Sequence, residues 1–219
     1  MKPTAGSPAP PAYGPAEERA SSLIHALGIA LSLAGLVLML VRVQDGHLRH
    51  LLSVCVYGIT LVALYTTSTL YHGLRHAPAK AVLRRLDHAA IFLLIAGTYT
   101  PFTLISLHGS TGWWLFGVVW VLALAGIALE FRRIRNRALM ATLYVGLGWL
   151  GVVAIEPLAA AIDDPGLWLL LGGGIAYTVG VPFYLSKRVP YMHAVWHVFV
   201  LLGSVLQFFA VWLYVLPRP

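Results

Sequence analysis

Seven long apolar runs dominate the hydropathy pattern of this 219-residue chain. Each run approaches or reaches the roughly 20 residues that a helix needs to cross a bilayer, and none shows the alternation that is typical of a strand. Isolated strands would leave backbone groups unpaired in lipid, so helices are the economical way to span it. The sequence therefore predicts an all-α bundle of seven transmembrane helices, over residues 20–43, 50–74, 86–107, 111–131, 138–155, 165–185 and 192–216.

The segment before the first run has a different composition. Residues 1–17 read MKPTAGSPAPPAYGPAE, and a stretch so rich in Pro, Ala and Gly cannot bury a core. We therefore expect a disordered tail over residues 1–17 and a transmembrane domain over residues 18–219. The hydrophobic region of a signal peptide has roughly 7 to 15 residues. The first run is longer, so we expect it to stay as the first helix.

Composition supports a membrane protein and changes the meaning of the charge. Hydrophobic residues make up 59% of the chain and charged residues 11%, whereas soluble domains carry about 25% charged residues. The net charge of +7 could suggest a nucleic-acid partner, but the basic residues sit in short clusters between apolar runs. That pattern is typical of topology signals, so we expect no nucleic acid. The single cysteine, Cys55, excludes an intrachain disulfide.

Basic residues are distributed unequally between the two ends of the predicted bundle. Twelve lie in the tail and in the loops after the second, fourth and sixth helices: Lys2, Arg19, Arg75, Lys80, Arg84, Arg85, Arg132, Arg133, Arg135, Arg137, Lys187 and Arg188. Three basic residues, Arg42, Arg49 and Arg218, lie at the other end. That end also carries an acidic loop. The positive-inside rule then predicts a cytoplasmic N-terminus and an external C-terminus in a multi-pass protein of the cell membrane.

Polar residues inside three of the spans are the candidates for function, because ionisable side chains are costly in lipid. The second span ends with Ser68 and His72, the third begins with Asp87, and the seventh begins with His193 and His197. Under the predicted orientation, all of them lie near the cytoplasmic ends of their helices. We therefore expect them to share one depth in the membrane.

Their spacing favours a metal site. His193 and His197 are four residues apart, so both lie on one face of a helix and can share an ion. A third imidazole from His72 would complete the three-ligand, one-water arrangement of a catalytic zinc. Asp87 would either bind the ion directly or take a proton from the bound water. Ser68, one turn from His72, would hydrogen-bond that water or a developing oxyanion.

Other interpretations stay open at this point. Two histidines with a carboxylate would suit iron(II). The histidine pair is also compatible with a headgroup region, and Asp87 with the N-terminal dipole of its helix. His25 either faces the same cavity or makes a hydrogen bond within the bundle. His88 follows Asp87 and points about 100° away from it around the helix, so it is a candidate for a supporting contact with a ligand.

Three motifs together resemble a known family. Ser68-Thr69-Leu70-Tyr71-His72, Leu86-Asp87-His88-Ala89-Ala90-Ile91 running on to Ala96-Gly97-Thr98-Tyr99-Thr100-Pro101, and His193-Ala194-Val195-Trp196-His197 resemble segments of the hemolysin III family. This is the bacterial branch of the progestin and adipoQ receptor superfamily, which includes the adiponectin receptors. Glu18 followed by His25 fits as well, and the resemblance covers about residues 17–216.

The resemblance implies seven helices, a cytoplasmic N-terminus and a zinc ion near the cytoplasmic face. It implies His72, His193 and His197 as ligands, with Asp87 holding a zinc-bound water and Ser68 nearby. The family is grouped with alkaline ceramidases, which implies hydrolysis of a lipid amide. Some bacterial members are described as haemolysins or pore formers, and others are linked to membrane-lipid homeostasis.

Three functions remain as hypotheses. The first is a zinc-dependent hydrolase of a lipid amide or ester. The second is a lipid-responsive receptor or regulator with a structural zinc, and the third is a cytolytic pore. A pore needs a polar stripe along whole helices, whereas the polar residues here gather at one end. A retinal protein is excluded because no lysine lies deep in a span. The only lysines are Lys2, Lys80 and Lys187.

Overall fold

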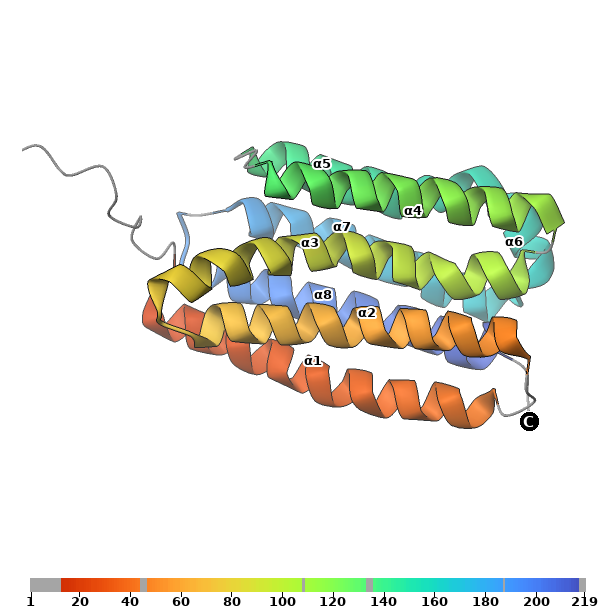
Figure 1. The fold of residues 1–219 in the computed structure, drawn as a ribbon, viewed down its shortest axis with the longest axis horizontal. Helices are drawn as coiled ribbons and strands as arrows, with labels where there is room; N and C mark the ends of the chain where they lie inside the picture. Colours follow the sequence, from red (N-terminus) through yellow and green to blue (C-terminus); the bar gives the residue numbers. More distant parts are fainter. Residues whose placement is uncertain (1–12, 44–46, 108, 133–135, 187, 217–219) are drawn as a thin grey trace, which may run out of the picture.

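The computed structural model describes residues 13–43, 47–107, 109–132, 136–186 and 188–216 (Figure 1). In this part of the chain it contains helices α1 (Pro15–Arg42), α2 (Leu48–Gly73), α3 (Ala77–Pro101), α4 (Gly109–Phe131), α5 (Arg137–Gly148), α6 (Ile155–Ala161), α7 (Asp164–Leu185) and α8 (Met192–Ala210). Shorter helical turns are η1 (Phe102–Ser106), η2 (Leu150–Ala154) and η3 (Val211–Val215). Together they form seven spans that are long and apolar enough to cross a membrane, so the predicted all-α, seven-span fold is confirmed.

Two helices begin five or more residues earlier than hydropathy predicts. Helix α1 begins at Pro15 and α3 at Ala77, each with a proline in its first turn. Proline is tolerated there because the N–H it lacks would have no partner in the helix. Charged residues in these turns lower the local hydropathy but do not stop the helix. Of the predicted tail, residues 1–12 lie outside the described residues.

The fifth span is a broken helix. Helix α5 ends at Gly148, Trp149 leaves the helical region with φ −90° and ψ 1°, and η2 then leads into α6. The Tyr99 hydroxyl lies 2.7 Å from the carbonyl oxygen of Gly148 and 2.7 Å from the amide nitrogen of Gly151, so it donates to the former and accepts from the latter. A break inside a membrane is tolerated where the freed backbone groups find such partners.

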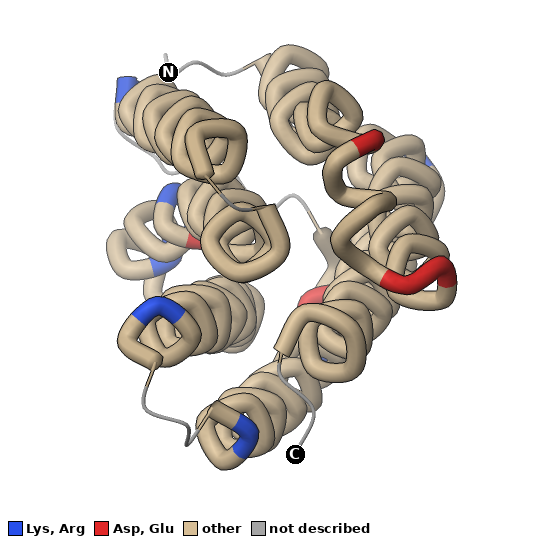
Figure 2. Tube along the Cα trace, turned by 90° about the vertical axis from the view of Figure 1, so that its right-hand side faces the viewer, with Lys and Arg blue, Asp and Glu red and all other residues tan. Residues whose placement is uncertain are grey.

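The helices form a closed arrangement in which neighbours in sequence are mostly neighbours in space (Figure 2). Helix α1 packs against α2 and α8, α2 against α3, α3 against α4, and α7 against α8. Helix α5 closes the arrangement by contacting α3, α4 and α7. Helices α1 and α8 therefore lie side by side although they are the first and last spans.

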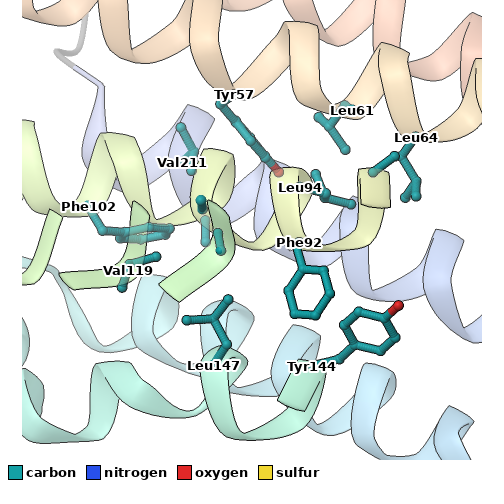
Figure 3. Packing of buried hydrophobic residues seen from close by; sticks show 14 of the residues in the cluster. Tyr57, Leu61, Leu64, Phe92, Leu94, Phe102, Val119, Tyr144, Leu147 and Val211 are labelled. Atoms are coloured by element: carbon teal, nitrogen blue, oxygen red, sulfur yellow. The ribbon is translucent and has the colours of Figure 1, made fainter. Parts of the chain in front are cut away.

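Small residues and interdigitated rings fill the interior. A Cβ atom on Gly97 would meet the Thr60 side chain, and one on Gly126 would meet the Phe92 ring. Small residues allow such close approach, and tight packing drives helix association in lipid. Phe92 also packs on Tyr144 with ring centroids 4.6 Å apart, which joins α3 to α5 (Figure 3).

Candidate metal centre

Three buried histidines converge at the end of the bundle where α1 begins. His72 lies in the last turn of α2, and His193 and His197 lie in the first two turns of α8. The Nε2 atom of His193 is 3.3 Å from that of His72 and 3.1 Å from that of His197. Each of the three offers one ligand atom, and these atoms all lie within 4.8 Å of one another, so the cluster could hold a metal ion.

The other ring nitrogens fix the protonation of two of these rings. Nδ1 of His72 lies 2.7 Å from a carboxylate oxygen of Glu18, and Nδ1 of His197 lies 3.3 Å from the carbonyl oxygen of Ser21. A carboxylate and a carbonyl oxygen only accept hydrogen bonds, so each Nδ1 carries the proton and donates it. The Nε2 atoms of His72 and His197 consequently present lone pairs to the shared point. Such a cluster of electron pairs favours a cation between them.

Tyr13 covers the third histidine. Its ring stacks on His193 with centroids 4.3 Å apart and planes 15° apart, and its hydroxyl lies 3.2 Å from the Nδ1 atom. Arg137 at the start of α5 donates a hydrogen bond of 2.8 Å to the same hydroxyl. Burial raises the pKa of the Tyr13 hydroxyl against the opposing effect of Arg137, so the group stays protonated at neutral pH. A hydroxyl can donate or accept, so His193 can also carry its proton on Nδ1.

Asp87 and Ser68 lie beside the cluster. Both side chains are buried, and both line the cavity that reaches His193 and His197. Asp87 is not in the group of described residues whose ligand atoms lie within 4.8 Å of one another. Ser68 and His72 both lie near the Asp87 carboxylate. This placement suits an Asp87 that acts through a water molecule.

The cavity is long and mostly apolar. On α3 and η1 its lining residues run from Asp87 to Leu107, which is about 30 Å of helix at 1.5 Å per residue. Threonines in its wall, such as Thr98 and Thr103, donate to carbonyl oxygens of their own helix turn. Among the residues that line it, His25, Ser68 and Tyr184 carry buried polar atoms with no hydrogen-bond partner in the described chain. His25 and Tyr184 lie against the histidine cluster and Ser68 is one turn from His72, so a ligand's polar group would be recognised at that end.

The two further histidines take different positions. His25 is buried, lines the cavity, and stacks on His197. His88 also lines the cavity, but its Nδ1 atom lies 3.2 Å from a carboxylate oxygen of Glu130 on α4. His88 is thus hydrogen-bonded to a side chain on a neighbouring helix, whereas neither ring nitrogen of His25 has a hydrogen-bond partner among the described residues.

Sequence patterns did not single out several residues that shape the centre. Tyr13 lies in the predicted disordered tail. Arg137 lies in a basic cluster that is interpreted as a topology signal. Glu17, which accepts a 3.1 Å hydrogen bond from the His193 amide, lies outside the predicted first span. The available signal was the pair of acidic residues Glu17 and Glu18 close after Pro15, since carboxylates favour the start of a helix.

Comparisons with known proteins agree with this architecture. The sequence model of the family described as "Haemolysin-III related" matches residues 13–208. The chain is 43% identical to Hemolysin-3 of Bacillus cereus over 203 residues, which cover 92% of this chain and 93% of the relative. It is 40% identical to the Hemolysin-3 homolog of Bacillus subtilis (strain 168), covering 93% and 96%. The human monocyte to macrophage differentiation factor is 26% identical, covering 93% of this chain and 86% of that protein.

The matched residues begin at Tyr13 and include all three histidines, Asp87 and Ser68. With seven spans and these relatives, the protein is a multi-pass protein of the cell membrane. The chain belongs to the hemolysin III family.

Proposed function

We propose that this protein is a zinc-dependent hydrolase of a lipid amide or ester that acts in membrane-lipid homeostasis. One observation carries the proposal: a long apolar cavity ends at the three-histidine cluster, where Asp87 and Ser68 also face it. The cavity suits an acyl chain, and the cluster suits the chemistry of a carbonyl group.

The geometry of the nitrogen atoms supports zinc. Two imidazole ligands of a tetrahedral zinc, each about 2.0–2.1 Å from the ion, lie about 3.3 Å apart. Two of the three separations between Nε2 atoms, 3.3 Å and 3.1 Å, are close to that value. An iron(II) site of two histidines and a carboxylate would need Asp87 among the ligands, but Asp87 lies outside the cluster. Three histidines leave the fourth position open, as in catalytic zinc sites.

A bound zinc ion would supply Lewis acidity and an acidified water at this position. The Asp87 carboxylate accepts a proton from the attacking water as the water oxygen bonds to the carbonyl carbon. The Ser68 hydroxyl has no hydrogen-bond partner among the described residues. It donates to the carbonyl oxygen of the substrate, which gains negative charge. The carbon–nitrogen or carbon–oxygen bond then breaks, and the proton passes from Asp87 to the leaving amine or alcohol. The products are a fatty acid and that amine or alcohol.

Two other functions predict different results. A receptor with a structural zinc would need no proton transfer at Asp87. A lytic pore, which the name of the Bacillus cereus relative suggests, would need a polar path along the bundle. The apolar wall of the cavity beyond the cluster argues against such a path.

The purified full-length protein tests the proposal through release of fatty acid from a lipid amide. Asp87→Asn keeps the shape and hydrogen-bonding ability of the side chain but accepts no proton. We expect it to keep its zinc and to lose about 10²–10⁴-fold in hydrolysis rate, whereas His197→Ala loses both zinc and hydrolysis. Asp164→Asn is the matched control, because Asp164 is exposed in the first turn of α7. A zinc-loaded Asp87→Asn with full hydrolysis, or full lipid phenotype in cells, would end the catalytic interpretation.

A further inference from the structure

All three ligand histidines meet a partner from one short segment of the chain. The Nδ1 atoms of His72, His193 and His197 contact, respectively, a carboxylate oxygen of Glu18, the hydroxyl of Tyr13 and the carbonyl oxygen of Ser21. These partners lie within residues 13–21, which we call the N-terminal brace. The ligands come from α2 and α8, but the partner of each comes from the residue pair before α1 or from the first two turns of α1.

The brace is itself held in place by charged residues from other elements. The Glu18 carboxylate that meets His72 also lies 3.0 Å from the Lys80 ammonium on α3. The Tyr13 hydroxyl accepts from Arg137, whose guanidinium lies 5.3 Å from the centre of the Tyr184 ring. Ser21 belongs to the α1 backbone, so its position follows from the helix. Each acceptor is therefore held by residues other than the three histidines.

We propose that Tyr13 and Glu18 are positioning residues of the metal centre, which set its affinity by orienting His193 and His72. This inference rests on the metal-binding part of the proposed function but not on hydrolysis. An acceptor at Nδ1 fixes the ring orientation, keeps the lone pair on Nε2 and raises its basicity. The removal of such a partner lowers metal affinity without removing a ligand.

One substitution at Tyr13 separates the effect of its hydroxyl on the orientation of His193 from the effect of its ring on packing. Tyr13→Phe keeps the ring that stacks on His193 but removes the hydroxyl that meets Nδ1. Glu18→Ala removes the acceptor for His72, and Glu18→Asp restores a carboxylate on a shorter stem. Two control changes of the same chemistry lie away from the cluster. Tyr99→Phe removes a hydroxyl that bonds backbone groups of the fifth span, and Glu130→Ala removes the partner of His88.

Zinc affinity of the purified full-length variants is measured by competition with a chromophoric chelator, together with the melting temperature with and without zinc. We expect Tyr13→Phe and Glu18→Ala each to weaken zinc binding by about 10–100-fold. The metal-free melting temperature of Tyr13→Phe should match that of the parent protein, and Glu18→Asp should recover part of the lost affinity. The two control variants should bind zinc as the parent does, whatever their effect on stability.

Wild-type zinc affinity in both Tyr13→Phe and Glu18→Ala would overturn the inference and leave the hydrolase proposal intact. Equal losses of affinity in the control variants would also overturn it, because the effect would then be one of general stability. A parent protein that binds no zinc would refute the metal centre itself, and with it both proposals. Loss of hydrolysis in Asp87→Asn is decided separately, since that variant keeps the brace and the ligands.

Discussion

His25 on α1 lies nearly parallel to His197 on α8, with ring centroids 3.8 Å apart and planes 18° apart. This stack makes α1 a wall of the candidate site and holds a buried imidazole at the polar end of the cavity. A buried polar side chain without a partner is costly, so His25 is suited to meeting a polar group of a bound ligand.

Replacement of His25 by phenylalanine therefore tests a contact with substrate. Phenylalanine keeps the stack on His197 and removes both ring nitrogens. We expect His25→Phe to retain zinc and to raise the KM for a lipid amide by about 10-fold, the value of one hydrogen bond of about 1.4 kcal/mol. His47→Phe is the matched control, at the exposed start of α2. An unchanged KM in His25→Phe would show that His25 only packs.

Metal identity is tested by elemental analysis of the purified protein. We expect about one zinc per chain and its loss in His193→Ala, because two imidazoles then remain. A ligand that binds only the folded state at 100 times its Kd stabilises it by about 2.7 kcal/mol, so zinc should raise the melting temperature of the parent only. His76→Ala, outside the cluster, should keep its zinc. Stoichiometric iron would contradict the assignment.

The depth of the cavity predicts selectivity for chain length. Ala154 in η2 is buried and lines the cavity toward the end of the fifth span, away from the histidines. Ala154→Phe shortens the space and should slow hydrolysis of long-chain lipid amides more than that of short-chain ones, with zinc content unchanged. Ala128→Phe, at an exposed position of α4, should leave the preference as it is. Equal effects on both chain lengths would place the acyl chain elsewhere.

The unequal distribution of basic residues, twelve at one end and three at the other, predicts the orientation in the membrane. A periplasm-active reporter fused after Arg218 should be active, and one fused after Arg135 should be silent. The reverse pattern would place the histidine cluster on the outer side of the membrane.

Helix packing predicts an opposite response at two glycines. Gly97→Ala would drive a methyl group against Thr60, and overpacking costs about 1–3 kcal/mol. Gly117 on α4 has nothing within 4 Å of an added Cβ, so Gly117→Ala should stabilise its helix by up to about 1 kcal/mol. Melting temperatures of the two variants in one detergent check the difference. A Gly97→Ala variant as stable as the parent would contradict the close contact of α2 and α3.

The fold was predictable because lipid permits few solutions. Length and hydropathy alone identify all seven spans, since a helix must be apolar for about 20 residues to cross. The break at Trp149 was not predictable, because it depends on a hydroxyl from Tyr99, 50 positions away in the chain. Hydropathy indicates whether a whole segment prefers lipid or water. It carries no information about a hydrogen-bond partner from another helix.

The histidines were predictable as a group because spacing and depth are properties of helices. His193 and His197 share a face by their separation, and His72 reaches them because α2 ends where α8 begins. The contributions of Tyr13 and Arg137 were not predictable. Each acts through contacts across more than 100 positions of sequence, from segments whose composition has a simpler explanation.

The division of the centre between α2 and α8 has a consequence for biosynthesis. The ribosome delivers the N-terminal brace first, and His72 follows in the second span. His193 and His197 arrive only with the seventh span, so a chain cut after α7 holds one of the three ligands. Capture of an ion by all three histidines would therefore have to follow insertion of the last helix. An ion held in this way would mark a finished molecule, and interrupted chains would stay without it.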